Sequence, residues 1–245
     1  MGKIIAVVSG KGGTGKTSFT ATVGIALANS GERVVCMDCD IALRNLDLAL
    51  GLSDRTIMDF SDVVTGRCTL AEAVVPHEKY PSLFLLAAPL CSQEPEISLR
   101  QMNALAAALR REFDYCLIDA PAGFTRGFQW ATAMADNVVV VTTTDPSALR
   151  DAQRTVQELR RFPSGRLHLV VNRVQRKLLK SLHTNIDDAI DMAGLPLLGV
   201  IPEDSDVPYV LGRGLPLRDN NYYASIAYEN IAKRLRGRHV PLMKL

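Results

Sequence analysis

The sequence of 245 residues predicts a doubly wound α/β fold, in which helices flank a mostly parallel sheet. Short runs rich in β-branched residues alternate along the chain with longer segments of helical periodicity. The short runs are apolar almost without interruption, as in Val138–Val141, which is typical of strands buried on both faces of a parallel sheet. No repeat, low-complexity tract or linker divides the chain, so we expect one domain over residues 1–245.

The expected strands and helices follow from these two patterns. Strands are predicted at Lys3–Ser9, Arg33–Asp38, Leu83–Ala87, Tyr115–Asp119, Asn137–Thr143, Leu167–Asn172 and Leu197–Ile201. Helices are predicted at Lys16–Ser30, Ser98–Arg111, Gly127–Met134, Ser147–Arg161, Leu182–Met192 and Tyr222–Arg236. Gly31 is expected to end the first helix, and residues 222–245 are expected to form a C-terminal helix and tail.

Composition and charge indicate an ordinary globular protein. Hydrophobic residues make up 47% of the chain and charged residues 22%, and the net charge of +2 argues neither for nor against a nucleic-acid partner. The apolar run after Lys3 is too short for a signal peptide, and no segment has the ~18 uninterrupted apolar residues of a membrane span. The odd number of cysteines, 5, fits free thiols in a reducing compartment. We therefore expect a cytoplasmic protein.

A glycine-rich loop between the first strand and the first helix carries the clearest chemical signal. Residues 10–17 satisfy G-x-x-x-x-G-K-[ST], the phosphate-binding pattern of P-loop nucleoside triphosphatases. Glycines let backbone N–H groups turn toward an anion, and the next helix points its positive dipole end at the same place. Lys16 would neutralise the phosphates of ATP or ADP, and the Thr17 hydroxyl would ligate Mg²⁺. The predicted nucleotide-binding residues of the loop are Gly10, Lys11, Gly12, Gly13, Thr14, Gly15, Lys16, Thr17 and Ser18.

Three aspartates lie at or just beyond strand ends beside this loop, namely Asp38, Asp40 and Asp119. Ligands of open α/β sheets bind at the carboxyl ends of the strands, so these side chains are expected near the phosphates. One carboxylate there can hold Mg²⁺ through water, and a second can orient the attacking water. A single aspartate would more simply cap the next turn, whereas three beside a phosphate loop favour the catalytic interpretation.

The loop contains a second lysine, Lys11, and its run K-G-G-T-G-K-T resembles the deviant Walker A motif of the MinD/ParA family of ATPases. The segments Met37–Leu48 and Leu117–Gly123 are similar to the two switches of that family, and Thr142–Arg154 is similar to its partner-facing segment. The run R-N-L-D at Arg44–Asp47 is most similar to the MinD branch. The resemblance covers nearly the whole chain and implies an ATPase that dimerises when it binds ATP.

The resemblance also implies catalytic and metal-binding roles for single residues. Lys11 would reach across the dimer to the phosphates of the partner chain, and Asp40 would position the hydrolytic water. Together with Lys16, these two residues form the expected catalytic set. The residues expected to ligate or support Mg²⁺ are Thr17, Asp38 and Asp119.

A base pocket is implied in the same way. Asn172 would read the adenine edge, because an amide can both donate and accept, although a turn-forming asparagine is a simple alternative. The other residues of this pocket are expected to be Arg173, Pro202, Glu203 and Asp204. The chain departs from the family pattern at Ala42, Phe124 and Thr125, where glycine, isoleucine and glutamate are usual. These departures concern contacts between switch and partner more than ATP binding.

Two further patterns have ordinary structural explanations. Cys36-x-x-Cys39 ends a strand instead of beginning a helix and has no second pair at zinc spacing, so buried structural thiols are expected. The basic stretch Arg150–Lys180 could bind DNA phosphates, but acidic residues are interleaved with it, which favours a solvated surface. Nucleic acid is therefore the less favoured partner.

The combined expectation is a MinD-like ATPase that cycles between a monomer and an ATP-bound homodimer, has an activating protein partner and positions the division site. The tail after Ile231 is basic and apolar, but Gly237 and Pro241 interrupt a continuous helix, so peripheral attachment to the inner face of the cell membrane is a hypothesis. The alternatives are a ParA-type DNA or cargo segregation ATPase, a flagellar-number regulator of the same family, and an ATP-dependent amidoligase or synthetase.

Overall fold

The centre of the fold is an eight-stranded sheet with the strand order β3-β4-β2-β5-β1-β6-β7-β8. The computed structural model describes residues 1–90, 96–175, 186–211 and 223–243. β3 pairs with β4 in antiparallel fashion, and the other neighbouring strands pair in parallel. The strands are β1 Lys3–Val8, β2 Val34–Asp38, β3 Val75–Pro76, β4 Leu83–Leu86, β5 Tyr115–Asp119, β6 Asn137–Thr142, β7 Leu167–Val174 and β8 Leu197–Pro202.

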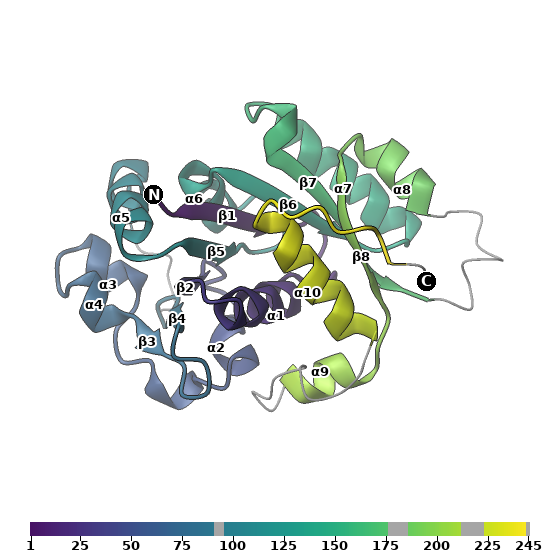
Figure 1. Cartoon of the computed structure of the whole chain (residues 1–245). Helices are drawn as coiled ribbons and strands as arrows, with labels where there is room; N and C mark the ends of the chain where they lie inside the picture. The colour runs from purple at the N-terminus through teal and green to yellow at the C-terminus, as the bar shows by residue number, and fades with distance from the viewer. Residues whose placement is uncertain (91–95, 176–185, 212–222, 244–245) are drawn as a thin grey trace.

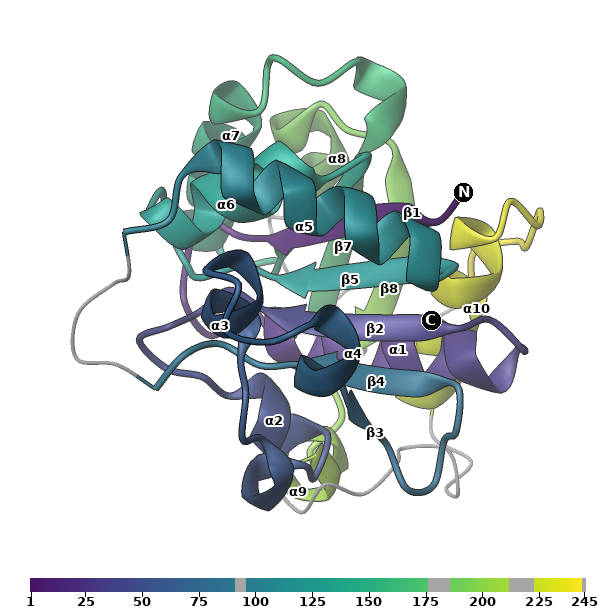
Figure 2. The ribbon, with the colours of Figure 1, turned by 90° about the vertical axis from the view of Figure 1, so that its left-hand side faces the viewer.

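Helices cover both faces of this sheet (Figure 1, Figure 2). One face carries α1 Lys16–Asn29, α2 Leu46–Ala49, α9 Asp206–Leu211 and α10 Tyr223–Leu235. The opposite face carries α3 Phe60–Val64, α4 Leu70–Ala73, α5 Leu99–Glu112, α6 Arg126–Met134, α7 Pro146–Glu158 and α8 Ile186–Ala193. Every residue of β2 and β5 is buried, because these strands lie between two layers of helices.

The strand order positions the site. It runs outward from β1 in two directions, to β5 and β2 on one side and to β6 and β7 on the other. A parallel sheet opens a crevice at the carboxyl ends of its strands where the order reverses in this way. The segments that follow β1, β2 and β5 therefore meet at one edge of the sheet.

The α/β fold predicted from the sequence is confirmed, and each predicted strand is present with bounds shifted by a residue or two. The predicted helix Leu182–Met192 is described from Ile186 onward, and residues 182–185 lie outside the described part of the chain. The shortest elements were not predicted, because helices of two turns or fewer and a strand of two residues carry little periodicity. These are α2, α3, α4, α9, β3 and the 3₁₀ turns Ser53–Arg55 and Ser164–Arg166.

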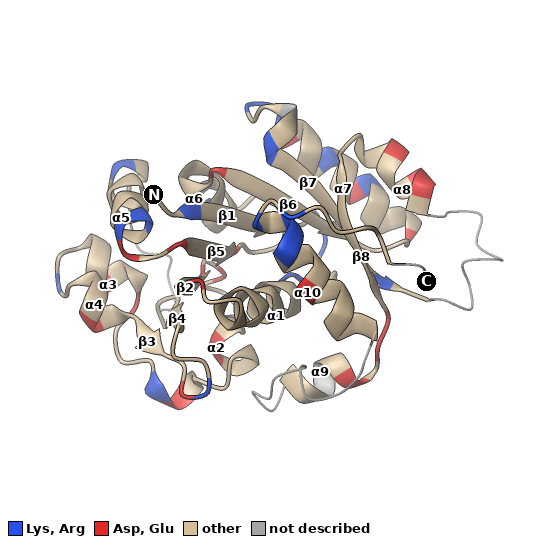
Figure 3. Cartoon of the chain, in the orientation of Figure 1, with Lys and Arg blue, Asp and Glu red and all other residues tan. Residues whose placement is uncertain are grey.

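The C-terminal tail is docked on the body of the protein. The Arg234 guanidinium, in the last turn of α10, donates to the carbonyl oxygens of Leu198, Val240 and Pro241 at 2.8, 3.0 and 2.8 Å. Gly237 makes the turn after the helix with φ 79°. Basic residues gather at this end of α10, where the tail folds back toward β6 and β8 (Figure 1, Figure 3). The tail up to residue 243 is thus an extended strap and not a continuation of the helix.

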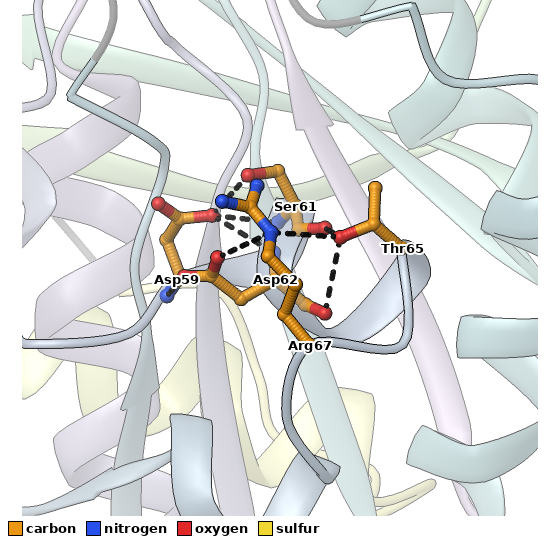
Figure 4. A network of polar contacts seen from close by, with 5 residues as sticks. All are labelled: Asp59, Ser61, Asp62, Thr65 and Arg67. Carbon is orange, nitrogen blue, oxygen red and sulfur yellow. Dashed lines mark hydrogen bonds and ion pairs between the residues drawn. The ribbon is translucent and has the colours of Figure 1, made fainter.

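A capping box fixes the short helix α3 (Figure 4). Asp59 Oδ1 accepts from the backbone N–H groups of Ser61 and Asp62 at 2.7 and 3.3 Å, and Asp62 Oδ2 accepts from the Asp59 N–H at 3.1 Å. These bonds satisfy N–H groups that the helix itself leaves unpaired. They also hold Phe60 at the start of α3, where its ring contacts the edge of Trp130 with 5.9 Å between the centroids.

We predict that Asp59→Ala lowers the free energy of unfolding by about 1 kcal/mol, because it leaves the first N–H groups of α3 without acceptors. Urea titration followed by circular dichroism measures the change. Asp54→Ala, at an exposed acidic position in the 3₁₀ turn that precedes α3, is the matched control and should change the value by less than about 0.5 kcal/mol. Equal effects of the two substitutions would contradict the assignment of the cap.

Candidate functional site

The glycine-rich loop wraps closely around its neighbours at the carboxyl end of β1. Gly15 has φ 92°, and a Cβ at this position would lie 2.3 Å from Asn172 Nδ2. A Cβ at Gly10 would lie 2.4 Å from the backbone oxygen of Asp151 in α7. Both positions therefore require glycine, one for its backbone conformation as well as its size. The loop leads directly into α1 at Lys16, whose first N–H groups face the same region.

Lys16 is a buried cation. Its side chain leaves the first turn of α1, and Nζ donates to the Ser9 hydroxyl at 2.9 Å. Burial lowers the pKa of Lys16, while the negative charges of Asp119 and Asp40 oppose that shift. A buried ammonium with a neutral hydrogen-bond partner favours an anionic ligand, because an added negative charge would offset its lost hydration.

Two carboxyl groups lie side by side beneath the loop. Asp38 ends β2 and Asp119 ends β5, and the two residues are partners in the parallel register. Thr17 Oγ1 donates to Asp119 Oδ2 at 2.6 Å, and Asp38 accepts from the backbone N–H groups of Asp40 and Leu46 at 2.8 and 3.2 Å. Asp119 Oδ1 is buried and has no hydrogen-bond partner.

The environment of these carboxyl groups disfavours their charged forms. Burial raises the pKa of Asp119 to about 7, against the opposing effects of Thr17 and Lys16. Burial and the nearby charge of Asp119 raise the pKa of Asp38 well above its usual range. A hard divalent cation would relieve both the repulsion and the unpaired oxygen, so the donor set of hydroxyl and carboxylate oxygens fits Mg²⁺.

A cavity of about 680 Å³ opens beside the loop, and Asp38 and Asp119 lie outside its lining. The first switch contributes Asp40 and Leu43 to its wall. Arg44 follows with φ 42°, a left-handed backbone that is rare outside glycine, and its side chain donates to Asp47 at 3.0 Å and to the Thr56 hydroxyl. The bent backbone of Arg44 thus keeps the segment that carries Asp40 folded against the rest of the chain.

The far end of the cavity is formed by the ends of β7 and β8. Asn172 Nδ2 donates to the Thr14 carbonyl at 2.8 Å, and its Oδ1 accepts from the Arg173 N–H at 2.9 Å. Arg173 has φ 56° and pairs with Glu203 at 3.2 Å. The Asn172 amide therefore fixes the phosphate loop in this conformation, and a contact with adenine stays a prediction.

Lys11 does not line this cavity. Its Nζ donates to Ser147 Oγ at 2.6 Å and lies 3.5 Å from Asp145, the residue that caps α7. The side chain is 47% exposed, in contrast to the buried Lys16. The two lysines of the loop therefore occupy different environments, one facing the nucleotide cavity and one facing a neighbouring helix.

The structure brings together most of the residues that the sequence analysis selected. The cavity is lined by Gly12, Gly13, Gly15, Lys16, Thr17, Ser18, Asp40, Asn172, Arg173, Pro202, Glu203 and Asp204, all selected beforehand. Seven further lining residues were not among the predicted site residues: Leu43, Asn45, Ala122, Ile201, Ser205, Val207 and Tyr228. Tyr228 comes from α10, and no local motif marks a helix residue that reaches a distant site.

Comparison with known proteins agrees with this geometry. Residues 5–217 match the CobQ/CobB/MinD/ParA nucleotide-binding domain family. The chain belongs to the MinD/ParA family. The septum site-determining protein MinD of Bacillus subtilis is 41% identical to it over 252 residues, which cover 100% of this chain and 93% of that protein. MinD of Synechocystis is 39% identical over 246 residues, which cover 99% and 92%.

Solved structures of MinD proteins share the fold. A chain of the MinC:MinD cell division protein complex from Aquifex aeolicus superposes with a TM-score of 0.91 and 34% identity over 99% of both chains. MinD from Pyrococcus horikoshii complexed with Mg-ADP gives a TM-score of 0.82 and 28% identity over 96% of both chains. The protein described here is thus a MinD-like ATP hydrolase of the division-site positioning type, and its cofactors are ATP or ADP and Mg²⁺.

Three further expectations concern the paired cysteines, the basic stretch Arg150–Lys180 and membrane-spanning helices. Cys36 and Cys39 are buried and free, and burial raises the pKa of both thiols, as expected for structural cysteines. Arg161 donates to Thr132 and Arg173 pairs with Glu203, so part of the basic stretch is engaged within the protein. Across the helices of the described chain, none combines the length and apolar character needed to span a bilayer.

The raised pKa of Asp119 predicts a pH dependence of stability in the absence of Mg²⁺ and nucleotide. The folded protein keeps a proton up to about pH 7 that the unfolded chain releases near its ordinary value of 3.8. The free energy of unfolding should therefore fall as the pH rises through this window. Urea titrations in EDTA between pH 5 and 8 should show a smaller fall for Asp119→Asn than for wild type. Asp54→Asn, at an exposed position, should behave as wild type, and parallel curves for all three proteins would contradict the prediction.

Proposed function

We propose that this chain is an ATP-dependent dimerisation switch that positions the division site. The observation that carries the proposal is that Lys16, Thr17 and Asp40 line one large cavity, while Thr17 is bonded to Asp119, the strand neighbour of Asp38. A buried cation, a hydroxyl and two carboxyl groups in this arrangement can hold a nucleoside triphosphate with its metal and respond to the number of phosphates present.

Each residue of the proposed site has a separate task. The loop N–H groups and Lys16 bind the phosphates, and Thr17 ligates Mg²⁺ with Asp38 and Asp119 behind it. Mg²⁺ held there would neutralise negative charge on the phosphates. Asp40, on the cavity wall, orients the hydrolytic water. The base lies among residues at the ends of β7 and β8, namely Asn172, Arg173, Pro202, Glu203 and Asp204.

Dimerisation is proposed because exposed side chains follow β1, β2 and β5 at the carboxyl edge of the sheet. Lys11 is half exposed and can leave Ser147 and Asp145 for the phosphates of a second chain. Leu43, in the first switch, and Phe124, which directly follows the second, are 67% and 45% exposed. A second copy that covered these apolar side chains would remove them from water, which favours association.

Partners and localisation extend the proposal. Because a MinD relative has been solved in a complex with MinC, we include a MinC-like regulatory protein among the partners of this chain. We treat residues 1–245 as one ATPase domain in which residues 222–245 form its C-terminal helix and tail. The tail offers exposed Arg238 and Leu242 to an anionic membrane surface at the inner face of the cell membrane.

We predict that the protein is a monomer with ADP and a dimer with ATP, as measured by light scattering after size exclusion. Asp40→Ala should dimerise with ATP and persist as a dimer, because it binds the nucleotide but does not activate water. Lys11→Ala should bind ATP and remain monomeric, because the lysine that it loses is proposed to contact the partner's nucleotide and not its own. A monomer in every nucleotide state, with normal ATP binding, would contradict the switch and favour a metabolic ATPase.

Vesicle flotation tests the membrane component. Anionic vesicles should float the protein in ATP, and Leu242→Glu should abolish this flotation, because the charge opposes insertion of the tail. Leu99→Glu carries the same charge at a similarly exposed leucine on α5 and should float like wild type. No flotation of wild type would remove the membrane from the proposal. Salt-sensitive retention on nonspecific DNA in ATP would instead favour the segregation ATPases.

A further inference from the structure

Tyr228 is a buried aromatic residue in the middle of α10. It is 1% exposed, and α10 packs against both α1 and β8. Its ring lies 6.3 Å from the ring of Phe19, centroid to centroid, at an interplanar angle of 56°. Phe19 follows Thr17 by two positions on α1. The aromatic pair therefore connects the helix that begins at the phosphate loop with the last helix of the chain.

Two cavities meet at this side chain. One is the nucleotide cavity of about 680 Å³, and the other is a smaller surface cavity of about 120 Å³ between α1 and α10. The smaller cavity is lined from α1 by Thr22, Ile25 and Ala26, and from α10 by Ser225, Glu229 and Lys233. Among the described residues, Tyr228 is the one that lines both cavities.

Tyr228 stands at the base end of the nucleotide cavity. Burial, and to a lesser extent the negative charge of Asp204, raises the pKa of the Tyr228 phenol. Pro202 and Val207, from the same side of the cavity, add apolar surface. Apolar surface on which a planar base can lie, with polar groups such as Asn172 and Asp204 beside it, is the usual environment for a base.

We propose that the Tyr228 ring is a partition that sets the upper size limit for the base of the bound nucleotide. With the ring in place, the base pocket ends at Tyr228 and the smaller cavity is closed to the ligand. With the ring removed, the two cavities join and the base pocket extends between α1 and α10. The inference rests on the proposed function, because it takes the larger cavity as the nucleotide site.

In Tyr228→Leu, the smaller cavity together with the space vacated by the phenol ring is large enough for a substituent of aromatic size. An apolar cavity of about 150 Å³ holds a benzene molecule. The smaller cavity supplies 120 Å³ before any space vacated by the phenol ring is added. Ile25 and Ala26 provide an apolar lining for such a group.

The test compares dissociation constants for ATP and for ATP analogues that carry a benzyl group at N6, C2 or C8 of the base, by competition with a ribose-labelled fluorescent ATP. Wild type should bind ATP and reject all three analogues. Tyr228→Leu should improve the binding of at least one analogue relative to ATP by about tenfold or more. Tyr228→Phe, which keeps the ring, should discriminate as wild type does, within about twofold.

A second substitution separates the partition from general loosening of the site. Ala26→Leu, added to Tyr228→Leu, fills the smaller cavity from the α1 side and should abolish the gained analogue binding without changing ATP binding. If Tyr228→Leu does not fold, Tyr228→Met provides the smaller truncation. Normal ATP binding without any gain for the analogues would overturn the partition alone, and failure of folded wild type to bind ATP would overturn the proposed function.

Discussion

The rest of the structure depends on the pairing of two buried carboxyl groups, Asp38 and Asp119, at the ends of adjacent strands. Hydrogen-bonded neighbours in a parallel sheet are about 4.8 Å apart, so the register that packs the core also forces these groups together. The protein gives them Lys16, the Thr17 hydroxyl and two backbone N–H groups, and one oxygen stays without a partner. The protein alone therefore leaves one carboxyl oxygen of this pair unsatisfied, and Mg²⁺ would supply its partner.

The first switch, Met37–Leu48, is positioned to respond to the charge of the Asp38–Asp119 pair. Asp38 accepts from the N–H of Leu46, which begins α2, so the buried pair is bonded directly to the switch segment. Between them the chain turns through the left-handed Arg44, whose guanidinium is held by Asp47 and Thr56. A change in charge at Asp38 thus alters an acceptor on which the fold of residues 40–47 relies.

The sequence was sufficient to predict what is encoded locally. Uninterrupted apolar runs identified the strands, and the spacing of glycines and lysines identified the loop, because both patterns reflect constraints within a few residues. The short helices α2, α3 and α4 depend on caps and on contacts such as Phe60 against Trp130, which periodicity does not contain. Tyr228 joins the site through helix packing alone, and the engagement of the Asn172 amide with Thr14 is likewise visible only in three dimensions.

The tie between Lys11 and the start of α7 has a consequence for how association responds to concentration. In a monomer this lysine is occupied by its own chain, through Ser147 and Asp145, so an approaching partner competes with a contact whose effective concentration never falls. The symmetric dimer proposed above requires two such contacts to break, one from each chain. The internal competition therefore enters the association equilibrium as a square, and a substitution that weakens the tie, being present in both protomers, counts twice in the free energy of the pair.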